Sequence, residues 1–307
     1  ITNYAVGVVL SGGQAPGGHN VIAGLFDGLK KLNSKNKLFG FLSGPSGLLE
    51  NKKIEITQAL IDNYRNTGGF DIIGSGRTKL ETEEQFDAVI KNCTAENISA
   101  IIIIGGDDSN TNACMLAEYA LRKKSTLTVV GCPKTIDGDL KNEMIEASFG
   151  FDTACKVYSE LIGNIMRDAL SAKKYWHFIR LMGRSASHIT LECALQTHPN
   201  IALISEEVAA NKQTLSSIVE NLARIIMERG NKGLNFGVAL IPEGLVEFIP
   251  EIKKLIAGIN DSLAHDEQFK TFTNHDQRVQ WLQSRLDPTL FPSFLSLPST
   301  LQSQLLL

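Results

Sequence analysis

The sequence has little cysteine, no long apolar run and no strong net charge, and each shortage argues against a class of protein. Its five cysteines stand far apart in 307 residues, with no CxxC pair and no histidine at a metal-ligand spacing, which disfavours a disulfide scaffold or a structural zinc site. No apolar stretch approaches the ~18 residues that cross a bilayer. The formal net charge of −3 does not suit a general nucleic-acid surface. We therefore expect reduced, mostly buried thiols and small-molecule partners, without nucleic acid or membrane.

The two ends of the chain carry further expectations. The N-terminus, ITNY, has neither the basic nor the apolar region of a secretory signal peptide, which favours a cytoplasmic protein. The first residue is not Met and the last three are Leu-Leu-Leu, and this abrupt apolar end predicts that the sequence is part of a longer chain.

Short apolar runs rich in β-branched residues recur along the chain, with amphipathic stretches between them. This alternation predicts βαβ units, and near-continuous apolar strands are typical of parallel sheets covered on both faces. We therefore predict an α/β fold with doubly wound, mostly parallel sheets. Strands are expected at 5–10, 101–106, 126–132, 178–183, 201–206 and 236–244, and helices near 18–33, 56–66, 82–97, 109–123, 152–172, 185–196, 212–229 and 248–263, with Ser109, Asp152 and Ser185 as N-caps.

The pattern also predicts how the chain is divided. We expect one α/β domain over residues 1–150 and a second over 151–245, because the strand pattern stops after PEG at 242–244. Residues 265–286 are polar and helical in pattern, and three prolines punctuate the segment that follows. Residues 246–307 are therefore expected to form a helical insertion or linker.

Ligands of doubly wound sheets bind beyond the carboxyl ends of the strands, and the first motif there is SGGQAPGGHN at 11–20. Glycines let the backbone approach an anion, and the helix that follows offers free N–H groups and the positive end of its dipole. The motif matches neither GxGxxG nor GxxxxGK[ST], so a dinucleotide site or Walker loop is not expected. A plain tight turn is the alternative.

The second motif, GGDDSN at 105–110, places two carboxylates where a buried strand should end. One carboxylate beside a phosphate-binding loop suits Mg²⁺, which is commonly held by one or two carboxylates and phosphate oxygens. The alternative is a helix N-terminus at which acidic side chains are favoured by the dipole.

The third motif, PKTIDGD at 133–139, has two aspartates around a glycine, preceded by Lys134 and Thr135. In phosphoryl transfer an aspartate can accept the proton of the attacking hydroxyl while cations offset the charge on the transferred group. Asp-Gly is also common turn chemistry, which leaves a structural turn open.

A fourth group consists of basic and polar loop ends: GSGRTK at 74–79, KKYWHFIRLMGR at 173–184 and PEG at 242–244. Arg77 and Arg184 each follow a glycine near an expected strand end, where a planar guanidinium can reach phosphate. Glu243 could accept hydrogen bonds from sugar hydroxyls. Each of these side chains could instead be a solvated surface residue.

Taken in order, the motifs resemble the phosphofructokinase family. Its pattern GGxxPG, GGDxS, TIDxD, MGR and PEG is matched by residues 12–17, 105–109, 135–139, 182–184 and 242–244. The resemblance implies two Rossmann-like domains, with the first binding the phosphoryl donor and the second fructose 6-phosphate. After PEG the family continues with further sheet and a basic segment that reaches the 6-phosphate, and nothing in 245–307 matches it.

The doubled acid points to one branch of that family. ATP-dependent members carry glycine at the positions of Asp108 and Lys134, whereas this sequence has charged residues at both. The chain therefore resembles the pyrophosphate-dependent branch, in which a carboxylate at position 108 would repel the α-phosphate of a nucleotide. The implied reaction is reversible, Mg²⁺-dependent transfer of a phosphoryl group from pyrophosphate to the 1-hydroxyl of fructose 6-phosphate, open to both glycolysis and gluconeogenesis.

The resemblance also implies roles for individual residues. Asp137 would be the general base, Lys134 and Asp108 would act at the transferring phosphoryl group and in donor choice, and Asp107 would hold Mg²⁺. The remaining implied contacts are Gly12, Gly13, Arg77, Gly106 and Ser109 for the donor, and Thr135, Ile136, Asp139, Lys174, Tyr175, Met182, Gly183, Arg184 and Glu243 for the sugar phosphate.

Family members build the sugar-phosphate site partly from a neighbouring subunit, and Lys174 and Tyr175 occupy that position here, which implies a homodimer or larger oligomer. Two alternatives stay open within the family: an ATP-dependent 6-phosphofructokinase, and a non-catalytic regulatory subunit. A regulatory subunit is expected to lack Asp107 or Asp137, and both are present.

Overall fold

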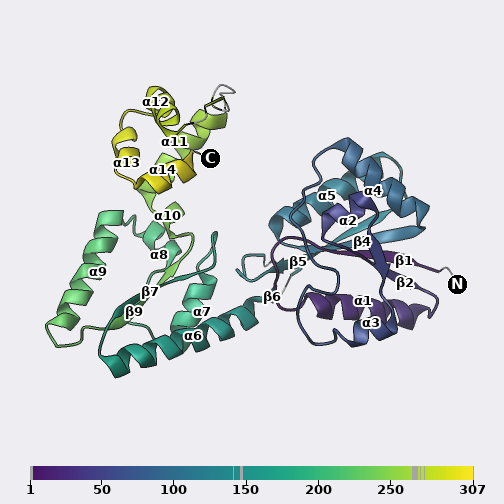
Figure 1. Cartoon of the computed structure of the whole chain (residues 1–307), viewed down its shortest axis with the longest axis horizontal. Coiled ribbons are helices and arrows are strands. Elements are labelled where there is room, and N and C mark those ends of the chain that lie inside the picture. The colour runs from purple at the N-terminus through teal and green to yellow at the C-terminus, as the bar shows by residue number, and fades with distance from the viewer. Residues whose placement is uncertain are drawn as a thin grey trace. The chain divides into compact units, whose positions relative to one another are not determined.

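The computed structural model describes residues 3–140, 142–145, 148–264, 269, 271–272 and 274–306. They form two compact units, Ile1–Tyr158 and Ser159–Leu307. The division falls inside helix α6 (Phe151–Ala172), near the change of domain expected at residue 150. Each unit is described by itself below (Figure 1).

The first unit is built on a six-stranded sheet in the order β3-β2-β1-β4-β5-β6. Neighbouring strands run parallel except for the antiparallel pair of β2 and β3. The chain winds outward from β1 in both directions, which is the doubly wound arrangement predicted from the sequence. The strands are β1 (Ala5–Leu10), β2 (Lys37–Phe41), β3 (Lys53–Glu55), β4 (Ile98–Gly105), β5 (Thr128–Thr135) and β6 (Phe149–Gly150).

Helices cover both faces of this sheet, because successive residues of its central strands point to opposite sides. Ile102 and Ile104 of β4 pack in one core with residues of helices α1 and α3, whereas Ile101 and Ile103 pack in a second core with α4 and α5. Figure 1 shows the two helix layers. The helices are α1 (Gly18–Leu32), α2 (Pro45–Glu50), α3 (Gln58–Asp62), α4 (Glu83–Ala95) and α5 (Asp107–Arg122).

The second unit contains a smaller parallel sheet in the order β7-β9-β8. The expected strand at 201–206 is wrong over most of its length, because β8 covers two residues and helix α8 begins at Ser205. The elements are α6 (Phe151–Ala172), β7 (Trp176–Leu181), α7 (His188–Thr197), β8 (Ile201–Ala202), α8 (Ser205–Ala210), α9 (Leu215–Gly230) and β9 (Gly237–Pro242).

All elements described after β9 are helices. Buried side chains of α11, α12 and α13, among them Trp281, Leu282 and Phe294, form a separate apolar cluster. This helical end agrees with the pattern of residues 246–307, although its nature as an insertion stays a prediction. The helices are α10 (Leu245–Phe248), α11 (Pro250–Ala264), α12 (His275–Arg285), α13 (Phe291–Leu295) and α14 (Ser299–Leu305).

The three expected N-caps are wrong. Gly106 precedes the first residue of α5, so Ser109 lies inside that helix. Asp152 lies inside α6, and Ser187 rather than Ser185 precedes α7. Within the described residues, no helix is long and apolar enough to span a membrane.

Candidate active site

The candidate site lies where the first sheet changes winding direction. Strands β1 and β4 are neighbours in register, with Leu10 opposite Ile104, and the chain leaves them toward opposite faces of the sheet. The Ser11 N–H donates to the Ile104 carbonyl (2.8 Å), and the Ser109 hydroxyl donates to Ser11 Oγ (2.8 Å). The two motifs that the sequence separates by about ninety residues therefore meet at the crevice where such sheets bind ligands.

The first half of the glycine motif lies beside the segment that carries Arg77. The Gly12 N–H donates to the Gly76 carbonyl (2.9 Å), and Gly12 has a φ of 84°, a left-handed value that favours glycine. A Cβ placed on Gly13 would stand 3.5 Å from the Arg77 guanidinium. Gly12, Gly13 and Arg77, all predicted to contact the donor, are thus brought together.

Helix α5 begins directly at the doubled acid. Gly106 is extended, and Asp107 and Asp108 occupy the first helical turn, where negative charge is favoured by the helix dipole. The Asn110 side chain donates to the Gly105 and Gly106 carbonyls, both at 2.8 Å. GGDDSN therefore forms a helix N-terminus with favoured acidic side chains, as the structural alternative predicted. This arrangement is compatible with a ligand-binding role.

Lys134 joins the end of β5 to the glycine motif. Its side chain is buried, and its ammonium group donates to the Gly13 carbonyl (2.7 Å). Burial lowers the pKa of Lys134, whereas the carboxylates of Asp137 and Asp107 act to raise it and the Arg77 guanidinium acts to lower it further. The four groups are therefore close enough to interact electrostatically.

The turn after Lys134 is held by short polar contacts. The Asp137 N–H donates to Thr135 Oγ1 (3.0 Å), a local turn contact that fixes the backbone at Asp137. Ser148 accepts from the Thr135 N–H (2.9 Å) and donates to the Thr135 carbonyl (3.0 Å). Asp137 is half-buried and Asp139 is exposed, while Ile136 packs near Gly150.

Asp108 has a partner that the sequence reasoning did not identify. The Lys79 ammonium lies 3.5 Å from Asp108 Oδ1, and both side chains are largely exposed. The backbone next to Lys79 is held by Asn112, whose side chain accepts from the Leu80 N–H (2.8 Å) and donates to the Leu80 carbonyl (3.1 Å). Lys79 thus lies within the GSGRTK motif, but nothing in the sequence marked it as the neighbour of Asp108.

In the second unit, the MGR and PEG motifs meet at the carboxyl ends of β7 and β9. Leu181 is opposite Pro242 in the register. The Glu243 N–H donates to the Leu181 carbonyl (2.8 Å), and the Gly244 N–H donates to the Gly183 carbonyl (3.1 Å). Met182, Arg184 and Glu243 are exposed there, so these predicted sugar-phosphate residues form one cluster.

Lys174 and Tyr175 do not join that cluster within one chain. They precede β7, whereas Met182 and Arg184 follow it, and the six residues of β7 separate the two ends by roughly 20 Å. Both side chains are exposed. A single subunit therefore cannot bring Tyr175 and Arg184 to one ligand.

Of the two carboxylates at the start of α5, Asp107 is the one that could bind a divalent cation, because Asp108 already faces Lys79. Asp107 is exposed and makes no side-chain hydrogen bond or ion pair within the described part of the chain. No cluster of three or more potential ligands among His, Cys, Asp and Glu occurs in the described residues. These features fit Mg²⁺ bound by one carboxylate together with ligand oxygens and water, and do not fit a closed protein cage.

A hollow of about 520 Å³ lies beyond the second half of the glycine motif. Its lining includes Gly17, Asn20, Gly68 and Phe149, none of which is among the predicted site residues. Phe149 of β6 is paired with Lys134 of β5, so the hollow borders the strand that carries Lys134.

Comparison with known proteins identifies the family of the chain. Residues 5–281 match the protein family described as Phosphofructokinase. A pyrophosphate--fructose 6-phosphate 1-phosphotransferase of Porphyromonas gingivalis is 60% identical over 98% of this chain and 55% of its own length. The Entamoeba histolytica protein of the same name is 58% identical with the same coverage, and subunit beta 2 from Arabidopsis thaliana is 54% identical over 98% of this chain and 52% of its own. The chain thus spans about half the length of the curated relatives it matches.

Solved structures agree on the fold. A pyrophosphate-dependent phosphofructokinase from Marinobacter aquaeolei has a TM-score of 0.66 at 20% identity, covering 86% of this chain and 66% of its own. The Pichia pastoris phosphofructokinase in the T-state has a TM-score of 0.63 at 21% identity, covering 80% of this chain and 28% of its own. At these identities the likeness concerns the fold alone.

Proposed function

The chain belongs to the phosphofructokinase family, and from this premise we propose that the whole protein is a phosphotransferase that converts pyrophosphate and fructose 6-phosphate into phosphate and fructose 1,6-bisphosphate. The names of the relatives that match 98% of the chain support this activity. The observation that carries the proposal is the cluster around Lys134, in which a buried ammonium group interacts with Asp107, Asp137 and Arg77 and donates to the Gly13 carbonyl.

Asp137 is the general base of the proposed reaction. Its carboxylate takes the proton of the sugar 1-hydroxyl as that oxygen bonds to the transferred phosphorus, and the bridging P–O bond breaks with its electron pair leaving on phosphate. The Thr135 contact to the Asp137 backbone supports this role, because it holds the turn in one conformation. In the reverse direction the same carboxyl group returns the proton.

Lys134 and Arg77 offset the charge of the donor. A phosphoryl group in transfer carries negative charge on its outer oxygens, and cations that are already in position stabilise it without reorganisation. Lys134 is held by the Gly13 carbonyl, and Arg77 stands beside Gly13. The backbone N–H groups near Gly12 and Gly106, with the Ser109 hydroxyl, complete a surface suited to phosphate oxygens.

Asp107 would hold the Mg²⁺ ion that this chemistry uses. When bound, the ion would neutralise charge on the phosphate oxygens and help to orient them. The exposed carboxylate at the start of α5 supports this assignment, and donor phosphates and water would supply the remaining ligands.

We propose that Met182, Gly183, Arg184 and Glu243 of the second unit contact the sugar phosphate, together with residues of a second subunit. Thr135, Ile136 and Asp139 of the first unit stay predicted contacts of the same ligand. Lys174 and Tyr175 would come from a neighbour, and this is supported by their place at the opposite end of β7. The names of plant relatives, which are called subunits, also support an oligomer.

Donor choice depends on Asp108 in this proposal. Its carboxylate stands in the first turn of α5 beside Lys79, where it would repel the additional phosphate of a nucleotide. Exposed ion pairs are weak, at about 0–1 kcal/mol, so Lys79 reduces this repulsion without removing it.

The test is fructose 1,6-bisphosphate formation on the full-length protein, with pyrophosphate and with ATP in parallel, for the wild type and for Asp108→Gly. We expect pyrophosphate alone to serve the wild type, and about a tenfold weaker use of pyrophosphate with some ATP use in the variant. Lys79→Met is the matched control, because it removes the partner but keeps the carboxylate, and it should not gain ATP use. Wild-type activity with ATP alone would overturn the donor assignment.

A further inference from the structure

Helix α1 begins with a buried histidine that the proposed chemistry does not use. His19, the second residue of α1, directly follows the second double glycine of SGGQAPGGHN, Gly17-Gly18, and is fully buried. Its ring faces the segment 64–72, which belongs to the same stretch of chain as Gly76 and Arg77. Buried polar groups are nearly always hydrogen-bonded, so the hydrogen-bond partners of this ring indicate its role.

The partners of the ring determine its tautomer. The Thr67 hydroxyl donates to the Tyr64 carbonyl (2.7 Å), so Thr67 Oγ1 accepts from His19 Nδ1–H across 2.6 Å. The Ile72 N–H donates to His19 Nε2 (3.2 Å). The ring is therefore neutral, with the proton on Nδ1 and an acceptor at Nε2.

The charged surroundings agree with this neutral form. Burial lowers the pKa of His19, and the Asp71 carboxylate, 3.4 Å from Nε2, acts to raise it. The Asp71 side chain is mostly exposed, which weakens its influence. Tyr64 is a second titratable neighbour among the described residues, and its ring meets the imidazole ring edge-on at 4.9 Å between centroids.

The ring contacts of His19 tether helix α1 to the segment 67–76, and backbone hydrogen bonds beside His19 add to this tether. The Gly17 N–H donates to the Gly68 carbonyl (2.6 Å), and the His19 N–H donates to the Gly69 carbonyl (3.0 Å). At the other end of the motif, Gly12 bonds to Gly76. The glycine motif is thus attached at both ends to the segment 67–76, and Arg77 follows immediately.

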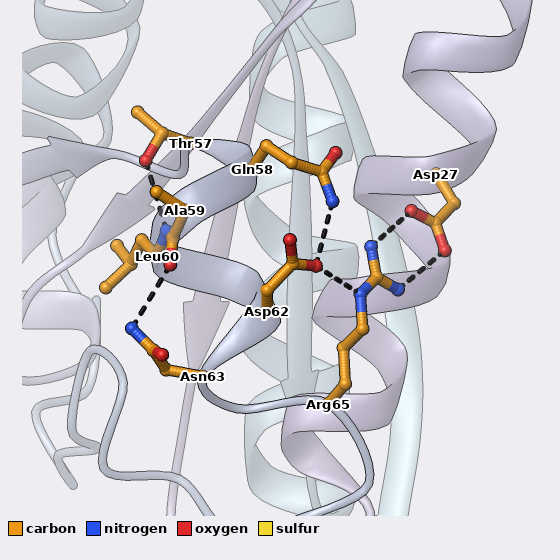
Figure 2. A network of polar contacts seen from close by, with 8 residues as sticks. All are labelled: Asp27, Thr57, Gln58, Ala59, Leu60, Asp62, Asn63 and Arg65. Carbon is orange, nitrogen blue, oxygen red and sulfur yellow. Dashed lines mark hydrogen bonds and ion pairs between the residues drawn. The ribbon is translucent and has the colours of Figure 1, made fainter.

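The segment is also anchored where it begins. Arg65 makes two contacts with the Asp27 carboxylate of α1, at 2.7 and 2.8 Å, and one with Asp62 at 2.7 Å. Figure 2 shows Arg65 reaching across to Asp27 while Asp62 is also held by Gln58. These residues are partly exposed, whereas the His19 ring is buried and its contact with the Ile72 N–H is buried as well.

We propose that His19 is a positioning residue that couples the glycine motif to the segment 67–76 and thereby fixes Arg77 and the Gly12–Gly13 backbone for pyrophosphate. This inference rests on the proposed function. His19 touches no predicted ligand, and acts by holding two groups of donor contacts at one spacing. Loss of its ring contacts should therefore weaken binding of the donor and leave that of the sugar phosphate largely unchanged.

The test compares His19→Leu, which removes both ring contacts, with His19→Gln, which keeps a polar group able to accept from the Ile72 N–H. Full-length protein is assayed for kcat and for KM of each substrate. We expect His19→Leu to raise the KM for pyrophosphate about tenfold with little change for fructose 6-phosphate, and His19→Gln to recover most of the loss. Ile22→Val, a buried change one turn further along α1, is the control for general destabilisation and should leave both KM values unchanged.

A second readout is independent of catalysis. Hydrogen exchange of the amides from 67 to 77 should accelerate in His19→Leu and remain near the wild-type rate in Ile22→Val. Thr67→Val removes the hydroxyl that accepts from His19 Nδ1–H and serves if His19→Leu does not fold. Unchanged exchange, or faster exchange with an unchanged KM for pyrophosphate, would overturn the proposal. If the wild type does not use pyrophosphate at all, the proposed function fails, whereas the exchange result still decides whether the tether exists.

Discussion

At the scale of single residues, the burial of the Lys134 side chain requires a physical explanation. Lysine is rarely buried without a partner, because an ammonium group loses its hydration there, and Lys134 is only 8% exposed. The Gly13 carbonyl and the carboxylates of Asp137 and Asp107 compensate for this loss. A buried ammonium group is stabilised by nearby negative charge, so this site is suited to bind the negative charge of a ligand.

Asp137→Asn tests the base directly. The amide cannot accept the proton of the sugar hydroxyl, so kcat should fall by about 10²–10⁴-fold. KM for both substrates should change little, because the Asp137 carboxylate acts in the transition state and not in substrate binding. Steady-state kinetics in the forward direction measure this. Asp139→Asn is the companion variant, for which a rise in KM for fructose 6-phosphate is expected instead. Turnover in Asp137→Asn close to the wild-type value would remove Asp137 from the mechanism.

The five cysteines can be compared directly with the prediction from the sequence. No disulfide joins the five, all of which lie in the described part of the chain, and Cys93, Cys155 and Cys193 are buried while Cys114 is exposed, which confirms the prediction of mostly buried thiols. Burial raises the pKa of Cys93 to about 12.

At the scale of elements, the strand-to-helix turns decide where the site stands. Gly105 ends β4 against Ser109 of α5, and a Cβ there would overlap the Ser109 side chain and lie 3.0 Å from the Ser11 carbonyl. The close approach of β4, α5 and the glycine motif therefore requires glycine at this position.

Gly105→Ala should consequently destabilise the protein by about 1–3 kcal/mol through overpacking, and should also weaken pyrophosphate binding because α5 must shift away from Ser11. Urea unfolding and donor titration measure the two effects. Gly24→Ala is the matched control, since a Cβ at this position of α1 meets nothing within 4 Å. It should stabilise the protein by about 0.4–1 kcal/mol. Equal behaviour of the two variants would contradict the packing argument.

At the scale of the whole molecule, the two ends of β7 carry residues of one predicted site. Since one chain cannot bring both ends to a single ligand, the proposed sugar-phosphate site needs two copies arranged so that Tyr175 of one approaches Arg184 of the other.

Mixed oligomers test this arrangement. Arg184→Ala and Tyr175→Ala should each be impaired in fructose 6-phosphate use. When the two full-length variants are unfolded together and refolded, some shared sites regain both native residues, so the mixture should exceed the summed activity of the separate variants. Refolding each variant alone is the control. Activity equal to that sum would argue against a shared site.

The stability of the molecule should also depend on pH through His19. Its pKa is lowered in the folded state by burial, so below the ordinary value of about 6.5 the unfolded chain binds the proton first. The free energy of unfolding should therefore fall as pH decreases from about 6.5 toward the lower folded-state pKa. Urea unfolding at a series of pH values measures this fall. His19→Gln should show a shallower dependence, and an identical slope in both proteins would contradict the assignment.

The sequence by itself determined the chemistry and its order along the chain. Apolar β-branched runs predicted β1, β4, β5, β7 and β9, because buried parallel strands need apolar residues on both faces, and the motifs at their ends were visible as glycine, acid and arginine patterns. Short elements such as β2, β3, α2 and α8 escaped prediction, since their few residues carry no clear period.

Tertiary structure alone decided which of these groups meet. The pairing of Ser11 with Ser109, of Lys79 with Asp108 and of His19 with Thr67 joins residues 98, 29 and 48 positions apart, and no local pattern encodes such distances. The separation of Tyr175 from Arg184 likewise follows from the direction of β7 in its sheet. Local composition specifies what a residue can do, whereas the strand order β3-β2-β1-β4-β5-β6 specifies its neighbours, because contacts between distant segments arise only when the sheet has formed.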